Sequence, residues 1–198
     1  PQALPENARK SLTGYLQVPR IMDEEDVIAR VREWVKGQRI DRVEAQWEPL
    51  VLMAARMREA FGVPGMSYDT VNGFRDKQLM KERIHAAGLR VPAAARCRTN
   101  TEVRDVAEQI GYPLIVKPID GAGSANTYRV DSEEELDRIL PRLVRVPEVS
   151  TEEFIEGEEF TYDTICIEGE VLFQNVAWYR PKPLVARQNP WISPQAIC

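Results

Sequence analysis

Apolar residues recur every three or four positions in two stretches before residue 70, which is the spacing of a helix with one buried face. The first stripe consists of Val27, Ile28, Val31, Trp34 and Val35. The second consists of Leu50, Met53, Ala54 and Met57. Short runs over 12–18 and 42–45 precede the two helices and are typical of strands. This alternation of strand and helix predicts a parallel α/β layer, with Trp34 and Trp47 in its core.

Behind residue 70 the pattern changes to that of a mixed α+β body. Helices are expected over 76–87 and 101–109 and after Ser132, where Pro141 shortens the last of them. Strands are expected over 93–97, 114–118 and 127–130, followed by consecutive strands between 150 and 179. Cys97 and Cys166 fall in these strands and are expected to be buried.

The composition excludes several classes of partner. The 198 residues contain 26 Lys and Arg against 31 Asp and Glu, a net charge of -5, which is too acidic for a broad nucleic-acid or membrane-binding face. No run approaches the roughly 18 apolar residues of a membrane span. The 3 cysteines lie far apart without a CxxC pair, so neither a disulfide framework nor a zinc site is offered. We therefore expect a cytoplasmic protein.

Lys117 interrupts the apolar run Leu114–Val116 inside an expected strand. A buried ammonium group is unfavourable unless an anion pairs with it, although a lysine on an edge strand that reaches solvent is the simpler alternative. Shortly afterwards, Gly121, Gly123 and Ser124 allow backbone N–H groups to approach an anion closely. The lysine and the loop together indicate a triphosphate clamp. The chain holds no GxxxxGK[ST] motif, so this clamp would lie on a β-hairpin instead of a P-loop.

The acidic segment Thr151–Phe160 alternates carboxylates with Phe154 and Ile155, as in a strand with one apolar and one polar face. Such a strand can hold a purine edge through backbone groups and a carboxylate, while apolar neighbours cover the ring. Gly157 allows a sharp turn that would bring Glu159 within reach of a ribose. A solvated acidic hairpin is the alternative for this segment.

Taken in order, these segments resemble the ATP-grasp superfamily, most closely its carboxylate-amine ligase and biotin carboxylase branch. The resemblance covers roughly residues 40–180 and rests on motifs at 75–81 with the exit 87–92, at 110–118, at 120–126 and at 152–159. It implies an α/β chain that begins with a partial parallel pre-ATP-grasp domain and continues into an incomplete α+β ATP-grasp domain. The implied divisions are 1–70 for the first domain, 71–92 for a linking helix, 93–155 for the N-terminal ATP-grasp subdomain and 156–198 for the start of the C-terminal one.

The resemblance also implies how each motif would contact ATP. Lys77 and Lys117 would hold the phosphates under the loop, Glu152 would take the adenine amino group, and Glu159 would hold the ribose. The implied binding residues are Lys77, Lys117, Gly121, Gly123, Ser124, Glu152, Glu153, Phe154, Ile155 and Glu159. Asn126 departs from the family, because many relatives carry glycine there.

The activity implied is that of a ligase. Such an enzyme uses ATP and Mg²⁺ to activate a small-molecule carboxylate as an acyl phosphate, which an amine then attacks. The family's magnesium ligands and catalytic arginine lie well downstream of the hairpin, and nothing after Tyr179 matches them. We therefore expect part of a longer enzyme, inactive alone, with no metal site in this chain. The alternatives to a ligase are a regulatory nucleotide-binding module and a kinase. The protein could also form a homodimer. The sequence does not identify the carboxylate or the amine substrate.

Overall fold

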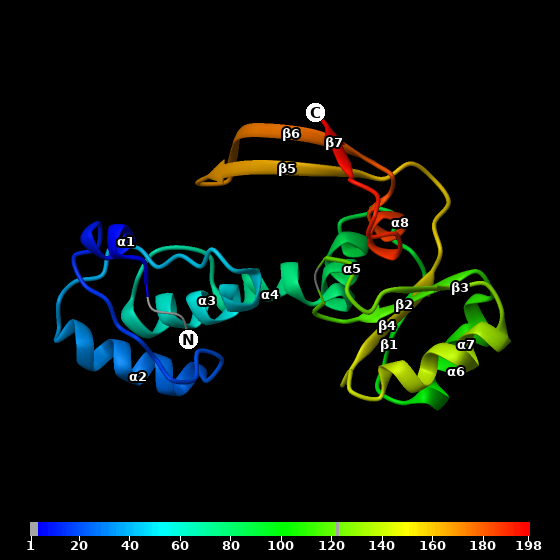
Figure 1. Ribbon diagram of the computed structural model, residues 1–198, viewed down its shortest axis with the longest axis horizontal. Coiled ribbons are helices and arrows are strands. Elements are labelled where there is room, and N and C mark those ends of the chain that lie inside the picture. The colour runs from blue at the N-terminus through cyan, green and yellow to red at the C-terminus, as the bar shows by residue number, and fades with distance from the viewer. Residues whose placement is uncertain (1–3, 122) are drawn as a thin grey trace. The chain divides into compact units, whose positions relative to one another are not determined.

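The computed structural model describes residues 4–121 and 123–198, so Ala122 of the predicted loop lies outside the described residues. The chain divides into two compact units, one up to Phe74 and one from Arg75 onward (Figure 1). Each unit has its own buried residues.

The described part of the first unit consists of helices and connecting segments. The helices are α1 (Glu6–Lys10), α2 (Glu24–Val35), the 3₁₀ turn η1 (Glu48–Leu50), α3 (Val51–Phe61) and α4 (Tyr68–Arg75). Helix α2 begins at Asp23, whose carboxylate accepts a hydrogen bond from the Asp26 N–H at 3.1 Å. Helix α3 ends at Gly62, which adopts a left-handed conformation with φ of 63°. Val27 of α2 and Met53 of α3 are buried.

The two strands predicted at 12–18 and 42–45 are wrong, because both segments are irregular in the structure. A strand needs a neighbouring backbone edge, and no segment of this unit's described residues provides one. Arg58 holds the second segment instead: its Nε donates to the Val43 carbonyl at 3.1 Å, and its guanidinium lies 3.6 Å from the Glu44 carboxylate.

Three predictions of burial are also wrong. Trp34 and Trp47 are 46% and 56% exposed, since residues 4–74 form no sheet for them to cover. Cys166 is exposed, whereas Cys97 is buried as predicted.

The second unit begins with helix α5 (Lys77–Ala86) and then forms a four-stranded antiparallel sheet with helices packed on it. The elements are β1 (Ala94–Cys97), α6 (Asn100–Ile110), β2 (Leu114–Pro118), β3 (Tyr128–Val130), α7 (Glu133–Ile139), the 3₁₀ turn η2 (Leu140–Leu143) and β4 (Val149–Glu153). The strand order is β1-β4-β2-β3. Helices α6 and α7 lie on one face of the sheet (Figure 1).

Strand β2 shows why the two faces of this sheet differ. Leu114 and Val116 are fully buried and point to the core shared with α6 and α7, where they meet Val103 and Leu136. Because side chains alternate along a strand, Lys117 lies on the opposite face, away from these helices. The sheet therefore has one apolar face that stabilises the unit and one face that is available for polar chemistry.

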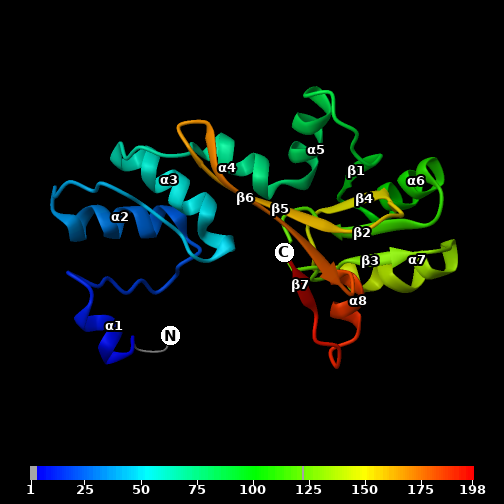
Figure 2. The same cartoon turned by 90° about the horizontal axis from the view of Figure 1, so that it is seen from above.

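The rest of the second unit is a three-stranded antiparallel sheet of order β5-β6-β7, with a short helix before its last strand. Its elements are β5 (Phe160–Ile167), β6 (Glu170–Arg180), α8 (Pro183–Gln188) and β7 (Gln195–Ile197). Strands β5 and β6 form the long hairpin in Figure 2, and β7 pairs with β6 at Trp178–Arg180. The mixed α/β fold class is confirmed by this architecture and by the structural comparisons given below. No helix of the described residues is long and apolar enough to cross a membrane.

Candidate functional site

A cavity of about 1000 Å³ lies in the second unit, over the polar face of strands β2 and β4. All ten binding residues predicted from the sequence line it, from Lys77 on α5 to Glu159 before β5. The cavity is further lined by Ile115, Arg129 and residues of the segment 181–188. The fold thus brings together residues that are far apart in the chain, and their individual contacts decide what the cavity can bind.

Lys77 joins the start of α5 to the glycine-containing loop. Asp76 caps helix α5. Its carboxylate accepts hydrogen bonds from the N–H groups of Gln78 and Leu79, each at 3.0 Å. The Lys77 ammonium donates to the carbonyls of Gly121 at 2.6 Å and Ile119 at 3.3 Å. Arg75 donates to the carbonyl of Asp120. These bonds place a positive charge directly beside the loop.

The loop after Gly121 turns through left-handed backbone conformations. Gly123, Ser124 and Asn126 have φ angles of 60°, 54° and 52°. Glycine adopts this region freely, and asparagine tolerates it better than most residues. Asn126 therefore suits the backbone that the loop requires.

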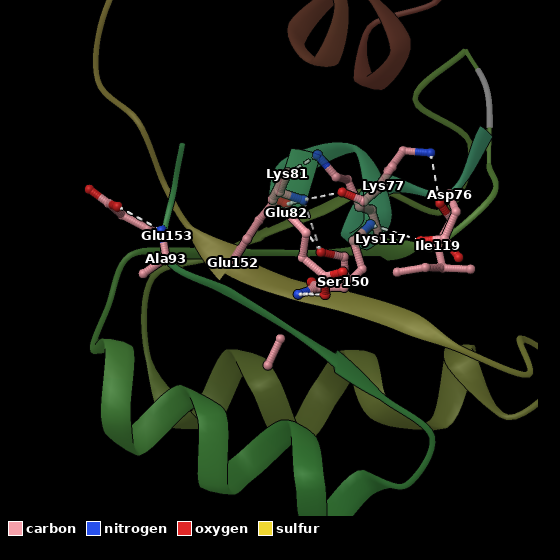
Figure 3. A network of polar contacts seen from close by, with 12 residues as sticks. Asp76, Lys77, Lys81, Glu82, Ala93, Lys117, Ile119, Ser150, Glu152 and Glu153 are labelled. Carbon is pink, nitrogen blue, oxygen red and sulfur yellow. Dashed lines mark hydrogen bonds and ion pairs between the residues drawn. The ribbon is translucent and has the colours of Figure 1, made fainter. Parts of the chain in front are cut away.

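Strand register places Lys117 beside Glu152. In the β2–β4 pair, Lys117 lies opposite Ser150 and Ile115 lies opposite Glu152, so all four side chains share one face. The Lys117 ammonium forms an ion pair with Oε1 of Glu152 (Figure 3). Oε2 of Glu152 lies 2.6 Å from the Lys81 ammonium and accepts a hydrogen bond from the Ser150 hydroxyl at 3.1 Å.

The carboxylate of Glu152 is thus buried, with three donors on its two oxygens. Burial by itself raises the pKa of this carboxyl group, but the ammonium groups of Lys117 and then Lys81 more than offset that effect, so its pKa lies below the usual value. Glu152 is therefore ionised at neutral pH, and two cations share one anion at the floor of the cavity.

The segment after Glu152 is fixed from outside the cavity. The Glu153 carboxylate accepts hydrogen bonds from Arg90 at 2.7 Å and from the Ala93 N–H at 3.1 Å. The backbone N–H groups of Glu153 and Phe154 donate to the carbonyls of Ala93 and Pro113. The central carbon of the Arg129 guanidinium lies 4.3 Å from the centroid of the Phe154 ring, and this cation–π contact holds the apolar ring in place. This segment is a rigid, partly apolar edge.

The remaining wall comes from the base of the β5–β6 hairpin and from α8. The indole of Trp178 donates to Glu158 at 3.0 Å and stacks on Phe160 with 6.0 Å between ring centroids. The Lys182 ammonium donates to the Gly157 carbonyl at 2.5 Å, which ties α8 to the turn before β5. Helix α8 was not predicted from the sequence. Its signal was Pro183, a residue suited to the first turn of a helix.

Two further residues of the site were missed. Lys81 stands four positions after Lys77 and so shares its helix face, a spacing that could have indicated a common partner. Arg96 is a charged residue within β1, and it pairs with Asp76 and Glu148, which fixes the start of α5 to the sheet.

Magnesium ligands were expected outside this chain. Within 4–121 and 123–198, no three His, Cys, Asp or Glu side chains gather in a way that could hold a metal ion. The described residues therefore offer cationic and backbone groups to an anionic ligand, without a metal cluster of their own.

Comparison with known proteins places this arrangement in a family. A family model described as an ATP-grasp domain matches residues 74–177. The L-arginine-specific L-amino acid ligase of Bacillus subtilis is 28% identical over 74% of this chain and 37% of its own length. The carbamoyl phosphate synthase large chain of Pseudomonas syringae is 31% identical over 78% of this chain and 15% of its own length. This chain thus spans well under half of either relative.

Two solved structures show the same fold. The L-amino acid ligase from Bacillus licheniformis has a TM-score of 0.70 and 28% identity, covering 82% of this chain and 38% of its own. The carboxyaminoimidazole ribonucleotide synthase from Aspergillus clavatus, complexed with ATP, has a TM-score of 0.70 at 21% identity, covering 89% of this chain and 46% of its own. Because the family model spans more than half of the chain, from the end of α4 to β6, this chain belongs to the ATP-grasp family.

Proposed function

We propose that this chain binds ATP in the cavity over β2 and β4 and forms part of a ligase that joins a carboxylate to an amine. The observation that carries the proposal is that Lys77, Lys117 and the glycine-containing loop face the same cavity as the rigid edge at 153–155. Family membership supports it, as do two relatives that are named L-amino acid ligases. Those names favour an amino acid as the small-molecule carboxylate.

In this proposal the cationic end of the cavity holds the phosphates. Lys77 and Lys117 would neutralise phosphate charge, and the backbone of Gly121, Gly123 and Ser124 would donate to phosphate oxygens. The loop through Asn126 would close over them. Its left-handed turn at 123–126 supports a role in which N–H groups converge on an anion.

The other end of the cavity would hold the nucleoside. Phe154 and Ile155 would cover the base, and Glu159 would accept hydrogen bonds from the ribose hydroxyls. Because the N–H groups of Glu153 and Phe154 already donate to carbonyls, the base edge would be read by other backbone groups of this segment. Glu152, which holds the two lysines and lines the cavity, would also take the adenine amino group.

The reaction we propose transfers the terminal phosphoryl group. A carboxylate oxygen of the substrate attacks the γ-phosphorus of ATP, the bond to the bridging oxygen breaks, and ADP leaves. An amine then attacks the acyl phosphate, and inorganic phosphate leaves with formation of an amide. Positioning and charge neutralisation by the lysines supply most of the protein's contribution, and a closed loop keeps water from the acyl phosphate. Mg²⁺ would neutralise further phosphate charge.

Trapping with hydroxylamine tests this reaction. A protein extended to the length of the relatives is incubated with ATP, Mg²⁺ and a panel of amino acids, and ADP and hydroxamate are measured. We expect both products with at least one amino acid. A stable phosphoester formed without a second nucleophile would indicate a kinase, and ATP binding without ADP release would indicate a regulatory module.

The shorter chain has its own expected behaviour. We expect the 198 residues alone to bind ATP without turnover, because they span only 37% of the length of the Bacillus subtilis ligase. A cytoplasmic location and a homodimer are part of the same proposal.

A further inference from the structure

We propose that Lys81 is a positioning residue that makes the phosphate end of the cavity cationic by neutralising Glu152. The proposal rests on the function proposed above, since it concerns how the same cavity attracts a polyphosphate. Lys81 acts through Glu152 and Lys117, without contacting the ligand itself.

The contacts of Lys81 are all internal. Its side chain is 8% exposed, and its ammonium lies 2.6 Å from Oε2 of Glu152. The same ammonium donates to the Ser150 hydroxyl at 3.3 Å and to the Lys77 carbonyl at 3.4 Å. Lys81 does not belong to the residues that line the cavity within the described chain. It therefore cannot serve as a direct phosphate ligand in this conformation.

Lys117 stands on the other side of the same carboxylate. It pairs with Oε1 of Glu152, lines the cavity, and keeps 24% of its side chain exposed. One anion thus lies between two cations, so the three groups together carry one positive charge. That charge is presented at Lys117, because Lys117 is the one of the two cations that lines the cavity.

The charge balance explains why a second lysine is present. If Lys81 were absent, the remaining pair of Lys117 and Glu152 would be buried and neutral. The attraction of Lys117 to a phosphate would then be opposed by its attraction to the carboxylate. These interactions are strong because the pair is shielded from water. With Lys81 present, the carboxylate is already compensated, and the Lys117 charge is available to an anion.

Binding of tripolyphosphate, ATP and adenosine to a set of variants tests the proposal. The variants are Lys81→Met, which keeps the length of the side chain, Lys81→Arg, which keeps the charge, and the double variant Lys81→Met with Glu152→Gln. Titration calorimetry gives the affinities, and thermal unfolding checks that each variant is folded. We expect Lys81→Met to weaken tripolyphosphate and ATP about tenfold or more while adenosine affinity changes less than about twofold. Lys81→Arg should stay close to the wild type.

The double variant provides the sharpest outcome. Removing both Lys81 and the Glu152 charge leaves Lys117 with one net positive charge again, so tripolyphosphate affinity should recover toward the wild-type value. If the role of Lys81 were purely structural, the double variant, with two changes at buried residues, would bind tripolyphosphate no better than Lys81→Met. The double variant also removes the uncompensated buried carboxylate, so it keeps the test usable if Lys81→Met alone fails to fold.

A coupling experiment completes the design. In a Glu152→Gln background, Lys81→Met should lower tripolyphosphate affinity by a clearly smaller factor than it does in the wild type, because the carboxylate that Lys81 compensates is gone. An undiminished loss in that background, or equal losses for adenosine and tripolyphosphate, would overturn the proposal. Wild-type protein that binds neither tripolyphosphate nor ATP would instead contradict the proposed function itself.

Discussion

The Glu152 carboxylate is buried in the site, and its protonation should contribute to how stability depends on pH. Its pKa lies below the usual value because Lys117 and Lys81 outweigh the effect of burial. The unfolded chain therefore takes up a proton at Glu152 before the folded chain does as the pH falls. The resulting stabilisation is fully present above the unfolded pKa of about 4.3 and is lost as the pH falls through the folded pKa.

The first prediction concerns a variant that lacks this titration. The free energy of unfolding of the wild type, measured in urea from pH 7 to pH 3, should fall more steeply with acid than that of Glu152→Gln. The difference should appear below about pH 4.5, where the unfolded carboxyl group begins to bind protons. Parallel curves for the two proteins over this range would show that Glu152 has no depressed pKa.

Lys117 illustrates what the sequence could and could not reveal about a single residue. A lysine between buried apolar positions is visible in the sequence, and the alternation of β2 explains why it reaches the polar face. Its partner Glu152 was not predicted as a partner, because the register between β2 and β4 is set by the whole sheet. The role of Lys81 was not predicted for a similar reason, because its burial depends on how α5 packs against the sheet.

Helix α5 depends on Arg96, which links it to the sheet. The Arg96 guanidinium pairs with Asp76, the N-cap of α5, and with Glu148, just before β4. The pKa of Asp76 lies below its usual value: burial raises it, but the hydrogen bond from Arg96 and the bonds from the helix N–H groups prevail. Lys77 follows Asp76 directly, so a displaced cap would also displace this lysine.

The second prediction uses Arg98 as a matched control for Arg96. Arg96→Met should lower the free energy of unfolding by about 1–3 kcal/mol, because it leaves the partly buried Asp76 carboxylate without its cation, removes one of the two cations of Glu148 and loosens the cap. Arg98→Met should cost less than about 1 kcal/mol, since the Arg98 side chain is 64% exposed and pairs with Glu148 at the surface. Urea unfolding measures both, and equal losses would show that the α5 attachment is not special.

The elements of the second unit were largely predictable, and so were helices α2 and α3 of the first unit, whereas the two strands expected in the first unit were wrong. Helix α6 has a capping box between Thr99 and Glu102, and β2 has strict alternation, so both are determined locally. The runs at 12–18 and 42–45 resemble strands in composition but form no ladder among the described residues. A strand is stable only with a partner, and the sequence pattern of a single segment does not report whether one is present.

The division of the chain at Phe74 suggests a third prediction, which concerns the independence of the second unit. Every residue that lines the cavity follows residue 74, and the core of that unit is formed by its own helices and sheet. A protein consisting of residues 75–198 should therefore fold and bind ATP within about threefold of the affinity of the 198-residue chain. Circular dichroism and calorimetry check this, and loss of folding in the shorter protein would show that the first unit is required.

The order of four motifs along the chain made the family recognisable from sequence, and the family model and the fold confirm it. The roles of the individual residues stay predictions, because the described structure shows their contacts with one another and not with a ligand. The site is also more constrained than the motifs suggested. Four of its groups, Lys77, Lys81, Lys117 and Glu152, belong to one continuous network, so a change at any of them affects the others.

The central claim, that the cavity over β2 and β4 binds ATP, is tested most directly by titrating ATP into Lys117→Ala. The matched control is Lys10→Ala, which changes an exposed lysine that pairs with Glu6 in the first unit. Lys117→Ala should weaken ATP binding about tenfold or more, while its thermal midpoint stays within about 3 °C of the wild type, since Glu152 keeps Lys81 as a partner. Lys10→Ala should change neither quantity. Unchanged ATP affinity together with a strongly lowered midpoint would mean that Lys117 serves the fold, and the account of this cavity as an ATP site would be contradicted.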